Sequence, residues 1–342
     1  MSYHDGNAIV IVQEDTLSDG IAVTVAGDNR LFLSARHTWN FWDYEKIQND
    51  PPIERKKQSF HYLKKELPRV NSQPIGLPAT FEVLHGSNLE IGMRVGIPWF
   101  QSSCGKCEYC LSGMENLCPN AKFTGFHVNG GFAEYIIADV RGILPISDKI
   151  EDCQAAPLLC AGIIGYRSLK KADLKPAERL GLFGFGASAH LAIQVAKYWD
   201  CEVYVFTRSQ NHREHARNLG ASWVGGADDE TPAYLDRAII FAPVGEIVPK
   251  ALEKLRPGGT LAINAIHMSP IPEMPYELIY GERTLRSVAN ATRQDGVEFL
   301  KLAVDIQIKS TYKTYHLTQA NQALIDLKHS KLNGEAVLKI SE

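Results

Sequence analysis

The segment that begins at residue 179 constrains the fold of this chain more than any other. An apolar run at 179–183 is followed by a glycine-containing turn, a helical pattern at 187–199 and a second apolar run at 202–206. A strand, a tight turn, a helix and a strand in this order form the crossover unit of a parallel sheet. We therefore predict a doubly wound α/β sheet. The further predicted elements are a helix at 213–219 and strands at 238–241, 260–263 and 336–340.

The turn after the first strand matches the G-x-G-x-x-A form of the dinucleotide-binding fingerprint. Gly184 permits a tight turn, Gly186 lets the backbone approach a pyrophosphate, and the small Ala189 lets the helix pack on the strand. The helix N-terminus adds unpaired N–H groups and a positive dipole. A tight turn without a ligand is the alternative. The predicted cofactor-binding residues of this turn are Gly184, Gly186, Ala187, Ser188 and Ala189.

The end of the second strand indicates which dinucleotide binds. An acidic residue there would accept a hydrogen bond from the ribose 2′-hydroxyl of NAD, whereas a cation accommodates the extra phosphate of NADP. The sequence at this point is Thr207-Arg208-Ser209, an arginine flanked by hydroxyls with no acid. We predict that these three residues bind NADP(H) in preference to NAD(H). The alternative is that Arg208 is a solvated surface residue.

Four cysteines at intervals of three, three and eight positions lie in the loop 103–119. A closed shell of four thiolates is the arrangement that zinc adopts in structural sites. An iron–sulfur cluster would require a shorter last interval. A disulfide framework fits poorly, because the chain has seven cysteines, an odd number. The predicted ligands of a structural zinc are Cys104, Cys107, Cys110 and Cys118.

Length and composition support two globular domains and exclude several classes of function. Of the 342 residues, 45% are apolar and 22% charged, which is ordinary for packed domains. A net charge of −3 does not supply the positive field that nucleic-acid binding requires. Because residues 1–20 lack a signal-peptide pattern and no apolar stretch is long enough to span a bilayer, we expect a cytoplasmic protein.

The first part of the chain differs in pattern from the parallel-sheet region. Short runs such as 21–25 and 31–33 predict strands, and turns are frequent as far as residue 150. The basic stretch 54–69 is predicted to be an amphipathic helix with a solvated face, with nucleic-acid or membrane binding as the alternative. Short elements return after residue 305. We therefore predict a β-rich domain at the N-terminal end of the chain.

These features resemble the zinc-containing alcohol dehydrogenases of the medium-chain dehydrogenase/reductase superfamily. The segments that carry the resemblance are 96–99, the cysteine loop, 130–135, 155–162, the turn at 184–189, 255–259 and the C-terminal strand. The resemblance implies a GroES-like catalytic domain, residues 1–150 completed by 306–342, and a Rossmann domain at 151–305. It further implies an active site between the two domains and a dimeric or tetrameric assembly.

In that family a second, catalytic zinc is bound by two cysteines and a histidine. The resemblance places Cys160 at the last of these ligands, but it places Arg36 and Leu77 at the other two. A single thiolate is too little for tight zinc binding, so we expect no standard catalytic zinc. The resemblance also makes His37 and Thr38 catalytic residues, with Thr38 holding the substrate oxygen and relaying its proton.

The leading functional hypothesis is therefore an NADP(H)-linked oxidoreductase that acts on small alcohols or aldehydes. A second hypothesis is a zinc-independent reductase of quinones or enones, whose substrates are already electrophilic. A third is a nucleotide-binding relative that no longer catalyses a reaction. The sequence does not identify the substrate, because the pocket would be lined by the residues whose pattern is least clear.

Overall fold

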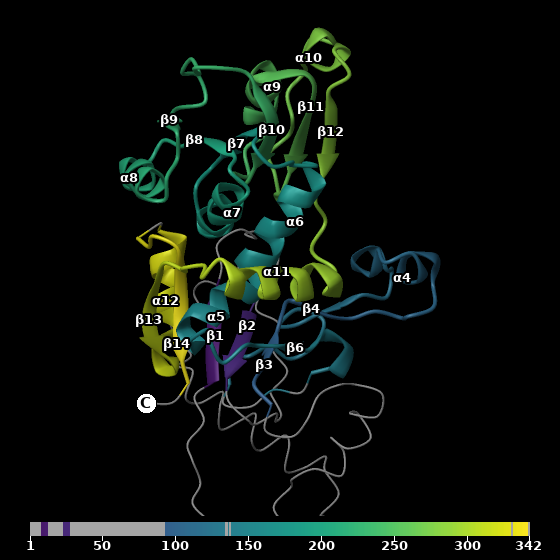
Figure 1. Ribbon diagram of the computed structural model, residues 1–342. Helices are drawn as coiled ribbons and strands as arrows, with labels where there is room; N and C mark the ends of the chain where they lie inside the picture. The colour runs from purple at the N-terminus through teal and green to yellow at the C-terminus, as the bar shows by residue number, and fades with distance from the viewer. Residues whose placement is uncertain are drawn as a thin grey trace, which may run out of the picture.

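The computed structural model describes residues 8–12, 23–27, 93–133, 136, 138–329 and 331–340, with the backbone alone for the first two segments. Two six-stranded sheets lie one above the other in Figure 1 and are joined by helices that run between them. This arrangement confirms the predicted combination of a GroES-like part and a Rossmann sheet. None of the helices within the described residues has both the length and the apolar composition that crossing a bilayer requires.

The upper sheet in Figure 1 is parallel throughout. Its strands are β7 (Arg179–Phe183), β8 (Glu202–Phe206), β9 (Trp223–Gly225), β10 (Leu235–Ile240), β11 (Leu255–Ile263) and β12 (Thr284–Ser287). Their order is β12-β11-β10-β7-β8-β9, so the direction of winding reverses between β7 and β10. In such sheets ligands bind beyond the carboxyl ends of the strands at the reversal.

Both faces of this sheet are covered. Leu180 and Leu182 of β7 pack in one apolar cluster with α6 (Ile163–Lys171) and α7 (Ala187–Tyr198). Phe183 points into a different cluster that contains residues of α9 (Ile247–Glu253). Burial on both faces explains why the strand sequences are continuous apolar runs, which made them legible in the sequence.

The lower sheet combines the two ends of the chain. Its strands are β13 (Tyr312–His316), β14 (Glu335–Lys339), β1 (Ala8–Val12), β2 (Val23–Gly27), β3 (Val95–Ile97) and β6 (Leu144–Pro145), in spatial order. β14 runs antiparallel to β1, with Val10 opposite Leu338. α12 (Ala320–Lys328) packs against β14, and their apolar residues share one cluster. The predicted strand near the C-terminus therefore pairs with the first described strand of the chain.

A nearly continuous helical segment links the two sheets. It consists of α5 (Asp152–Pro157), a single π-helical turn (Leu158–Gly162) and α6. α11 (Arg293–Asp305) packs across it, and the approach is close: a Cβ on Gly162 would lie 2.3 Å from the Phe299 ring. Single π-helical turns are frequent at functional sites, and this one contains Cys160.

Several element boundaries differ from the prediction, including the start of β10 at 235 instead of 238, and two of the differences have a clear local structure. α8 (Gln210–Asn218) begins three residues before the predicted position, because the Ser209 hydroxyl caps its N-terminus. β11 begins at 255 instead of 260, and the predicted turn around Gly258 is an irregularity within the strand, where the register with β10 shifts and φ is +73°. The predictions for 31–33 and 54–69 lie outside the described residues.

Candidate active site and zinc lobe

Four loops gather at the carboxyl edge of the parallel sheet. They follow β7, β8, β11 and β12, and because the strands are parallel, all four lie at one edge. The first two contain the residues predicted to bind the cofactor. The other two, which include Asn264 and Asn290, line a pocket that reaches the π-helical turn.

The turn between β7 and α7 has the geometry that the fingerprint requires. Gly184 has φ +91°, and a Cβ there would lie 2.9 Å from the amide nitrogen of Ala242. Around Gly186, by contrast, a Cβ would meet no described atom within 4 Å. No side chain from the described residues caps α7 at this end, so its first N–H groups remain available to an anion. The residues present therefore fit a pyrophosphate.

The last residues of the fingerprint serve packing. Ala187, Ser188 and Ala189 are all buried. A Cβ on Gly165 of α6 would lie 2.8 Å from the Ser188 carbonyl oxygen, so α6 and α7 approach closely here. Small residues at these positions permit that contact. They therefore set the position of the helix N-terminus rather than offering side-chain contacts of their own.

The three residues after β8 have different environments. Thr207 is buried, and its carbonyl oxygen accepts a hydrogen bond from Arg213 Nε at 2.9 Å. The Ser209 hydroxyl accepts from the His212 amide at 3.4 Å as the cap of α8. The Arg208 side chain is exposed and has no hydrogen bond or ion pair with any described residue. Arg208 is thus the member of this group whose charge is free for a ligand.

The pocket lies between the two sheets and is mainly apolar. Trp99 and Phe100 line it from the lower part, and Cys160 lines it from the π-helical turn. Two buried N–H donors of lining residues, Trp99 Nε1 and Asn290 Nδ2, have no hydrogen-bond acceptor among the described residues. A buried donor without an acceptor costs free energy, so both favour a ligand that carries oxygen acceptors. A carboxamide or a carbonyl is a group of this kind.

Among the described lining residues, Cys160 is the one side chain of a type that binds zinc. The predicted catalytic residues His37 and Thr38 lie outside the described residues. So do Arg36 and Leu77, which the resemblance placed at the other two ligand positions. Cys160 thus reaches the pocket as expected, while the rest of the predicted catalytic set is not described.

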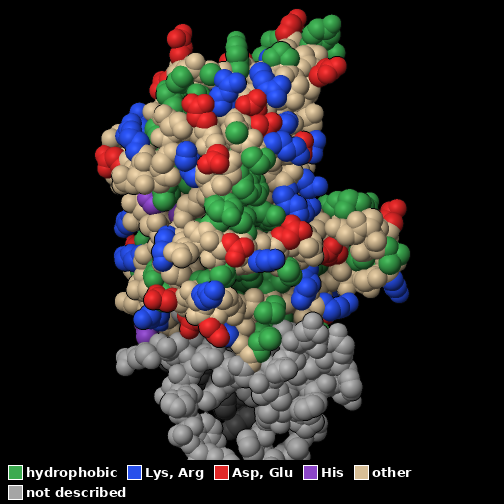
Figure 2. Space-filling model, viewed as in Figure 1, with side chains coloured by type: hydrophobic (Ala, Val, Ile, Leu, Met, Phe, Trp, Pro, Cys, Tyr) green, Lys and Arg blue, Asp and Glu red, His purple; other side chains and the backbone are tan. Residues whose placement is uncertain are grey.

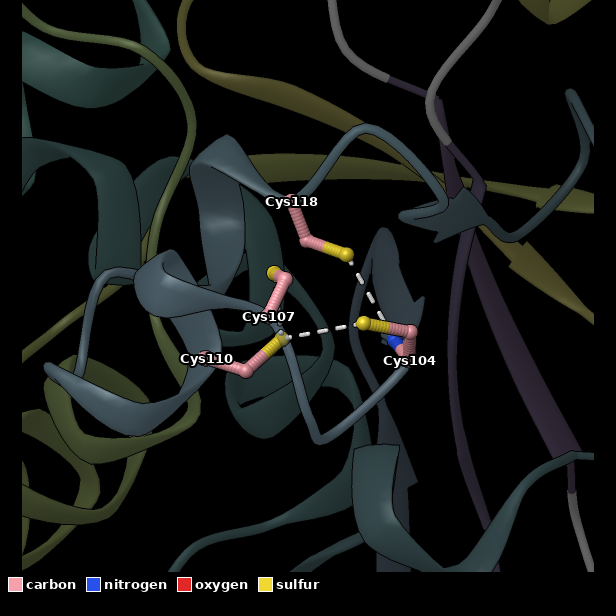
Figure 3. Close-up of side chains that lie close together, drawn as sticks. All are labelled: Cys104, Cys107, Cys110 and Cys118. Carbon is pink, nitrogen blue, oxygen red and sulfur yellow. Dashed lines mark hydrogen bonds between the residues drawn. The ribbon is translucent and has the colours of Figure 1, made fainter.

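The four cysteines of the loop point toward one another (Figure 3). Their sulfur atoms all lie within 4.8 Å of one another, and they form the one such grouping of metal-binding side chains among the described residues. The Cys104 and Cys110 sulfurs are 3.9 Å apart, and those of Cys107 and Cys110 are 3.5 Å apart. A tetrahedral zinc with bonds of about 2.3 Å sets its sulfurs about 3.8 Å apart, so the donor set fits zinc.

The electrostatics of the cluster also favour a cation. Hydrogen bonds from the amides of Lys106 and Cys107 lower the pKa of Cys104 to about 6. The amide of Cys110 favours the Cys107 thiolate, but burial and the neighbouring thiols outweigh it and raise the pKa of Cys107 to about 11. The four sulfurs therefore do not ionise together on their own, whereas a divalent cation stabilises all four thiolates.

The segment that carries these cysteines, 103–119, projects from the body of the molecule as a lobe (Figure 1). It contains α4 (Glu108–Leu111), which has no buried residue, and a short 3₁₀ helix (Glu115–Leu117). Apolar side chains are exposed on the lobe (Figure 2). Leu111 has 76% of its surface accessible. Segments with so little core of their own are commonly stabilised by a metal or by disulfides.

Contacts between the lobe and the pocket were not anticipated from the sequence. Asn116 and Glu115 bind the backbone at Ala289 and Arg293 respectively, and no sequence pattern connects positions so far apart. The capping box of α11, in which Thr292 and Asp295 bind each other's backbone amides, was also missed. Its signal was present, because threonine followed three positions later by an acid is a helix-start pattern.

Comparisons with known proteins relate both parts of the chain to one family. A family model described as the alcohol dehydrogenase GroES-like domain matches residues 80–148. A second, described as zinc-binding dehydrogenase, matches residues 189–305. The two matches fall on the two parts of the chain that form different sheets.

Curated relatives agree with these matches. The chain is 45% identical over 256 residues to a probable alcohol dehydrogenase, AdhA, of Mycobacterium tuberculosis, a match that covers 75% of this chain and 74% of that protein. It is 31% identical over 289 residues to an alcohol dehydrogenase of Geobacillus stearothermophilus, covering 82% of this chain and 85% of that protein.

Solved structures share the fold. A cinnamyl alcohol dehydrogenase of Sorghum bicolor superposes with a TM-score of 0.68 at 24% identity, covering 74% of this chain and 76% of that chain. An enzyme of Helicobacter pylori named CAD, solved in complex with NADP(H), gives a TM-score of 0.66 at 24% identity, covering 73% and 76%.

Proposed function

Because the chain belongs to the zinc-containing alcohol dehydrogenase family of the medium-chain dehydrogenase/reductase superfamily, we propose that it transfers hydride between NADP(H) and a small alcohol or aldehyde. Relatives named alcohol dehydrogenase identify it as an alcohol dehydrogenase-like oxidoreductase. The preference for NADP(H) and the substrate class are the parts that we propose.

The observation that carries the proposal is the position of Cys160. Its side chain lines a pocket together with Asn264 and Asn290, which follow β11 and β12 at the edge where the nucleotide turn also lies. A dinucleotide whose pyrophosphate binds at Gly186 extends along this edge. In this proposal the nicotinamide end of the cofactor and a small substrate bind in the same pocket.

The reaction moves two electrons and two protons in a balanced way. NADP⁺, when bound, would supply the acceptor for a hydride from the alcohol carbon, and the alcohol hydroxyl would give a proton to Thr38 and then to water. The products are the aldehyde, NADPH and H⁺. In this proposal Thr38 has the role of holding the substrate oxygen and His37 is the second catalytic residue; both lie outside the described residues. The apolar walls at Trp99 and Phe100 favour a small apolar substituent and exclude water.

Two observations support NADP(H) over NAD(H). The strand β8 ends in Thr207-Arg208-Ser209 without an acid to bind a ribose 2′-hydroxyl. The Arg208 guanidinium is exposed and has no partner among the described residues, so binding a 2′-phosphate would break no existing ion pair. Because the Ser209 hydroxyl already caps α8, we assign the main charge-assisted contact to Arg208.

We also propose that the zinc of this chain lies in the lobe. Cys104, Cys107, Cys110 and Cys118 would hold it, and it would stabilise the lobe without an open position for a substrate. The pocket offers Cys160 alone among the described lining residues, and the sequence has Arg36 and Leu77 at the family's other two ligand positions. We therefore derive no catalytic step through a second zinc.

Steady-state kinetics on the purified, zinc-loaded protein test the proposal. With a panel of small aldehydes, kcat/KM is expected to be at least about tenfold higher with NADPH than with NADH, because a charge-assisted hydrogen bond contributes about 1.5–3 kcal/mol. The Arg208→Ala variant should lose most of this preference. Arg217→Ala, which removes an exposed arginine of α8, is the matched control.

Each part of the proposal has its own contradicting result. Equal kcat/KM for the two cofactors, or an unchanged preference in Arg208→Ala, would disprove the NADP(H) assignment. Turnover of quinones or enones without turnover of any aldehyde would disprove the substrate class.

A further inference from the structure

We propose that Glu115 and Asn116 of the zinc lobe are positioning residues that clamp the pocket segment 289–293. The inference rests on the proposed function for the identity of the pocket's ligands, while the contacts themselves do not depend on it. The lobe then has a role in the active site that its closed metal shell alone does not suggest.

The clamp holds the pocket segment at both ends. Asn116 Nδ2 donates a hydrogen bond of 2.6 Å to the Ala289 carbonyl oxygen. Glu115 Oε1 accepts a hydrogen bond of 2.8 Å from the Arg293 amide. The residues between these two anchors, 290–292, all line the pocket. Adjacent residues of one short helix therefore fix the two ends of a five-residue pocket wall.

The segment between the anchors needs external support. Asn290 has φ +56°, in the left-handed region that non-glycine residues rarely adopt, and its Oδ1 accepts from the next amide at 2.7 Å. Such a conformation persists when surrounding contacts hold it. On the far side, Arg293 also donates from its guanidinium to the Ile143 carbonyl oxygen at 3.3 Å, which ties the same segment to the lower sheet.

The two clamp contacts differ in kind: the Asn116 bond joins two neutral groups, and the Glu115 bond is charge-assisted. Asn116 has 7% of its surface exposed, so its hydrogen bond to Ala289 is sheltered from water. The Glu115 carboxylate binds the first amide of α11, where the helix leaves its N–H groups unpaired and its dipole favours negative charge. A lost contact therefore leaves the Ala289 carbonyl or the first amide of α11 without its protein partner.

The metal ligands determine where the clamp residues lie. Glu115 and Asn116 are in the 3₁₀ helix between Cys110 and Cys118, so two of the four thiolates flank them in sequence. The lobe has little apolar core of its own, as the absence of buried residues in α4 illustrates. We expect the cysteine cluster to position the 3₁₀ helix, and the 3₁₀ helix to position the pocket segment 289–293.

Amide hydrogen exchange measures the clamp directly, without cofactor or substrate. In the zinc-loaded protein, Glu115→Ala and Asn116→Ala should each speed exchange in a peptide covering 287–295 by roughly three- to tenfold, the effect of losing one hydrogen bond. Glu115→Gln keeps an acceptor and should restore slow exchange. Glu108→Ala in the lobe and Asn120→Ala directly after it, both at exposed positions, are the matched controls and should leave exchange unchanged.

Cofactor binding provides the second readout. In the clamp variants the Kd and KM for NADPH should rise by roughly three- to tenfold, with a smaller change in kcat. Glu108→Ala and Asn120→Ala should match the parent. The cofactor measurement depends on the proposed function, whereas the hydrogen-exchange measurement does not. If the protein fails to bind or use NADPH, the exchange result still decides whether the clamp holds the segment.

The results that would overturn the proposal are specific. Unchanged exchange at 287–295 in both alanine variants would show that the contacts do not hold the segment. Loss of zinc from Glu115→Ala or Asn116→Ala, measured by elemental analysis, would show that these residues act on the metal site instead. Equal effects in Glu108→Ala and Asn120→Ala would show a general loosening of the lobe.

Discussion

Arg167 and Asp295 form an ion pair in which both side chains are buried, with 8% and 1% of their surfaces exposed. The pair joins α6 to the first turn of α11. Asp295 Oδ2 also accepts hydrogen bonds from the amide and the hydroxyl of Thr292, which lines the pocket. The pair therefore fixes the start of α11 at the position where the pocket wall ends.

Removing the arginine should leave a buried carboxylate without its main partner. Arg167→Met should lower the free energy of unfolding by about 3 kcal/mol, the lower end of the range for broken buried pairs, because Lys170 Nζ remains 3.0 Å from Asp295. Urea denaturation measures the change. Lys301→Met on the exposed face of α11 is the control and should cost less than about 0.5 kcal/mol. An Arg167→Met protein as stable as the control would contradict the role assigned to the pair.

Asp295 also predicts a pH dependence. Burial alone would raise the pKa of this carboxyl, but the hydrogen bonds from Thr292 and the charge of Arg167 outweigh it and lower the pKa below its usual value. The stabilisation is therefore complete above the unfolded value of about 3.9 and is lost as the pH falls through the folded pKa. We therefore expect the free energy of unfolding to fall more steeply between about pH 5 and about pH 2 in the parent protein than in Asp295→Asn. Identical slopes would refute this account.

The two glycines of the nucleotide turn should respond differently to the same substitution. Gly184→Ala places a Cβ 2.9 Å from the Ala242 amide at φ +91° and should cost about 1–3 kcal/mol of stability. Gly186→Ala meets no described atom within 4 Å, so its stability should stay within about 0.5 kcal/mol of the parent. Its affinity for NADPH should nevertheless fall, because the methyl group occupies the space of the pyrophosphate. Thermal unfolding and fluorescence titration separate the two effects, and unchanged NADPH binding in Gly186→Ala would contradict the assigned site.

The location of the zinc can be tested by elemental analysis. Cys118→Ser should remove the zinc and lower Tm by about 5 °C or more, because binding to a structural site contributes folding free energy. Cys160→Ser should retain the metal content of the parent. Loss of zinc in Cys160→Ser, or its retention in Cys118→Ser, would show that the pocket rather than the lobe holds the ion.

Some features of this protein follow directly from local sequence. β7 and β8 were predicted with their observed ends, because strands buried on both faces are continuous apolar runs. The cysteine cluster follows from spacing, since all four ligands lie within fifteen residues of one another. α8 begins earlier than predicted because Ser209, a residue predicted to bind the cofactor, instead caps the helix N-terminus.

Other features depend on contacts between distant parts of the chain. Glu115 and Arg293 are separated by 178 positions, and neither lies in a pattern that indicates the other. The pocket likewise combines Trp99, Cys160 and Asn290 from three separate segments. Tertiary packing brings these residues together, and local sequence propensity does not predict such long-range contacts. The sequence could therefore predict the nucleotide turn and the grouping of the four cysteines, but not the contacts between the lobe and the pocket.

The most direct test of the central claim is the destination of the hydride. NADPH carrying deuterium on the transferable position of the nicotinamide is incubated with the enzyme and an α,β-unsaturated aldehyde, and the product is analysed by NMR. The account predicts an unsaturated alcohol with deuterium on the former carbonyl carbon. Deuterium on the β-carbon would identify an enone reductase, and no transfer at all would identify a non-catalytic nucleotide-binding protein; either result would contradict the account.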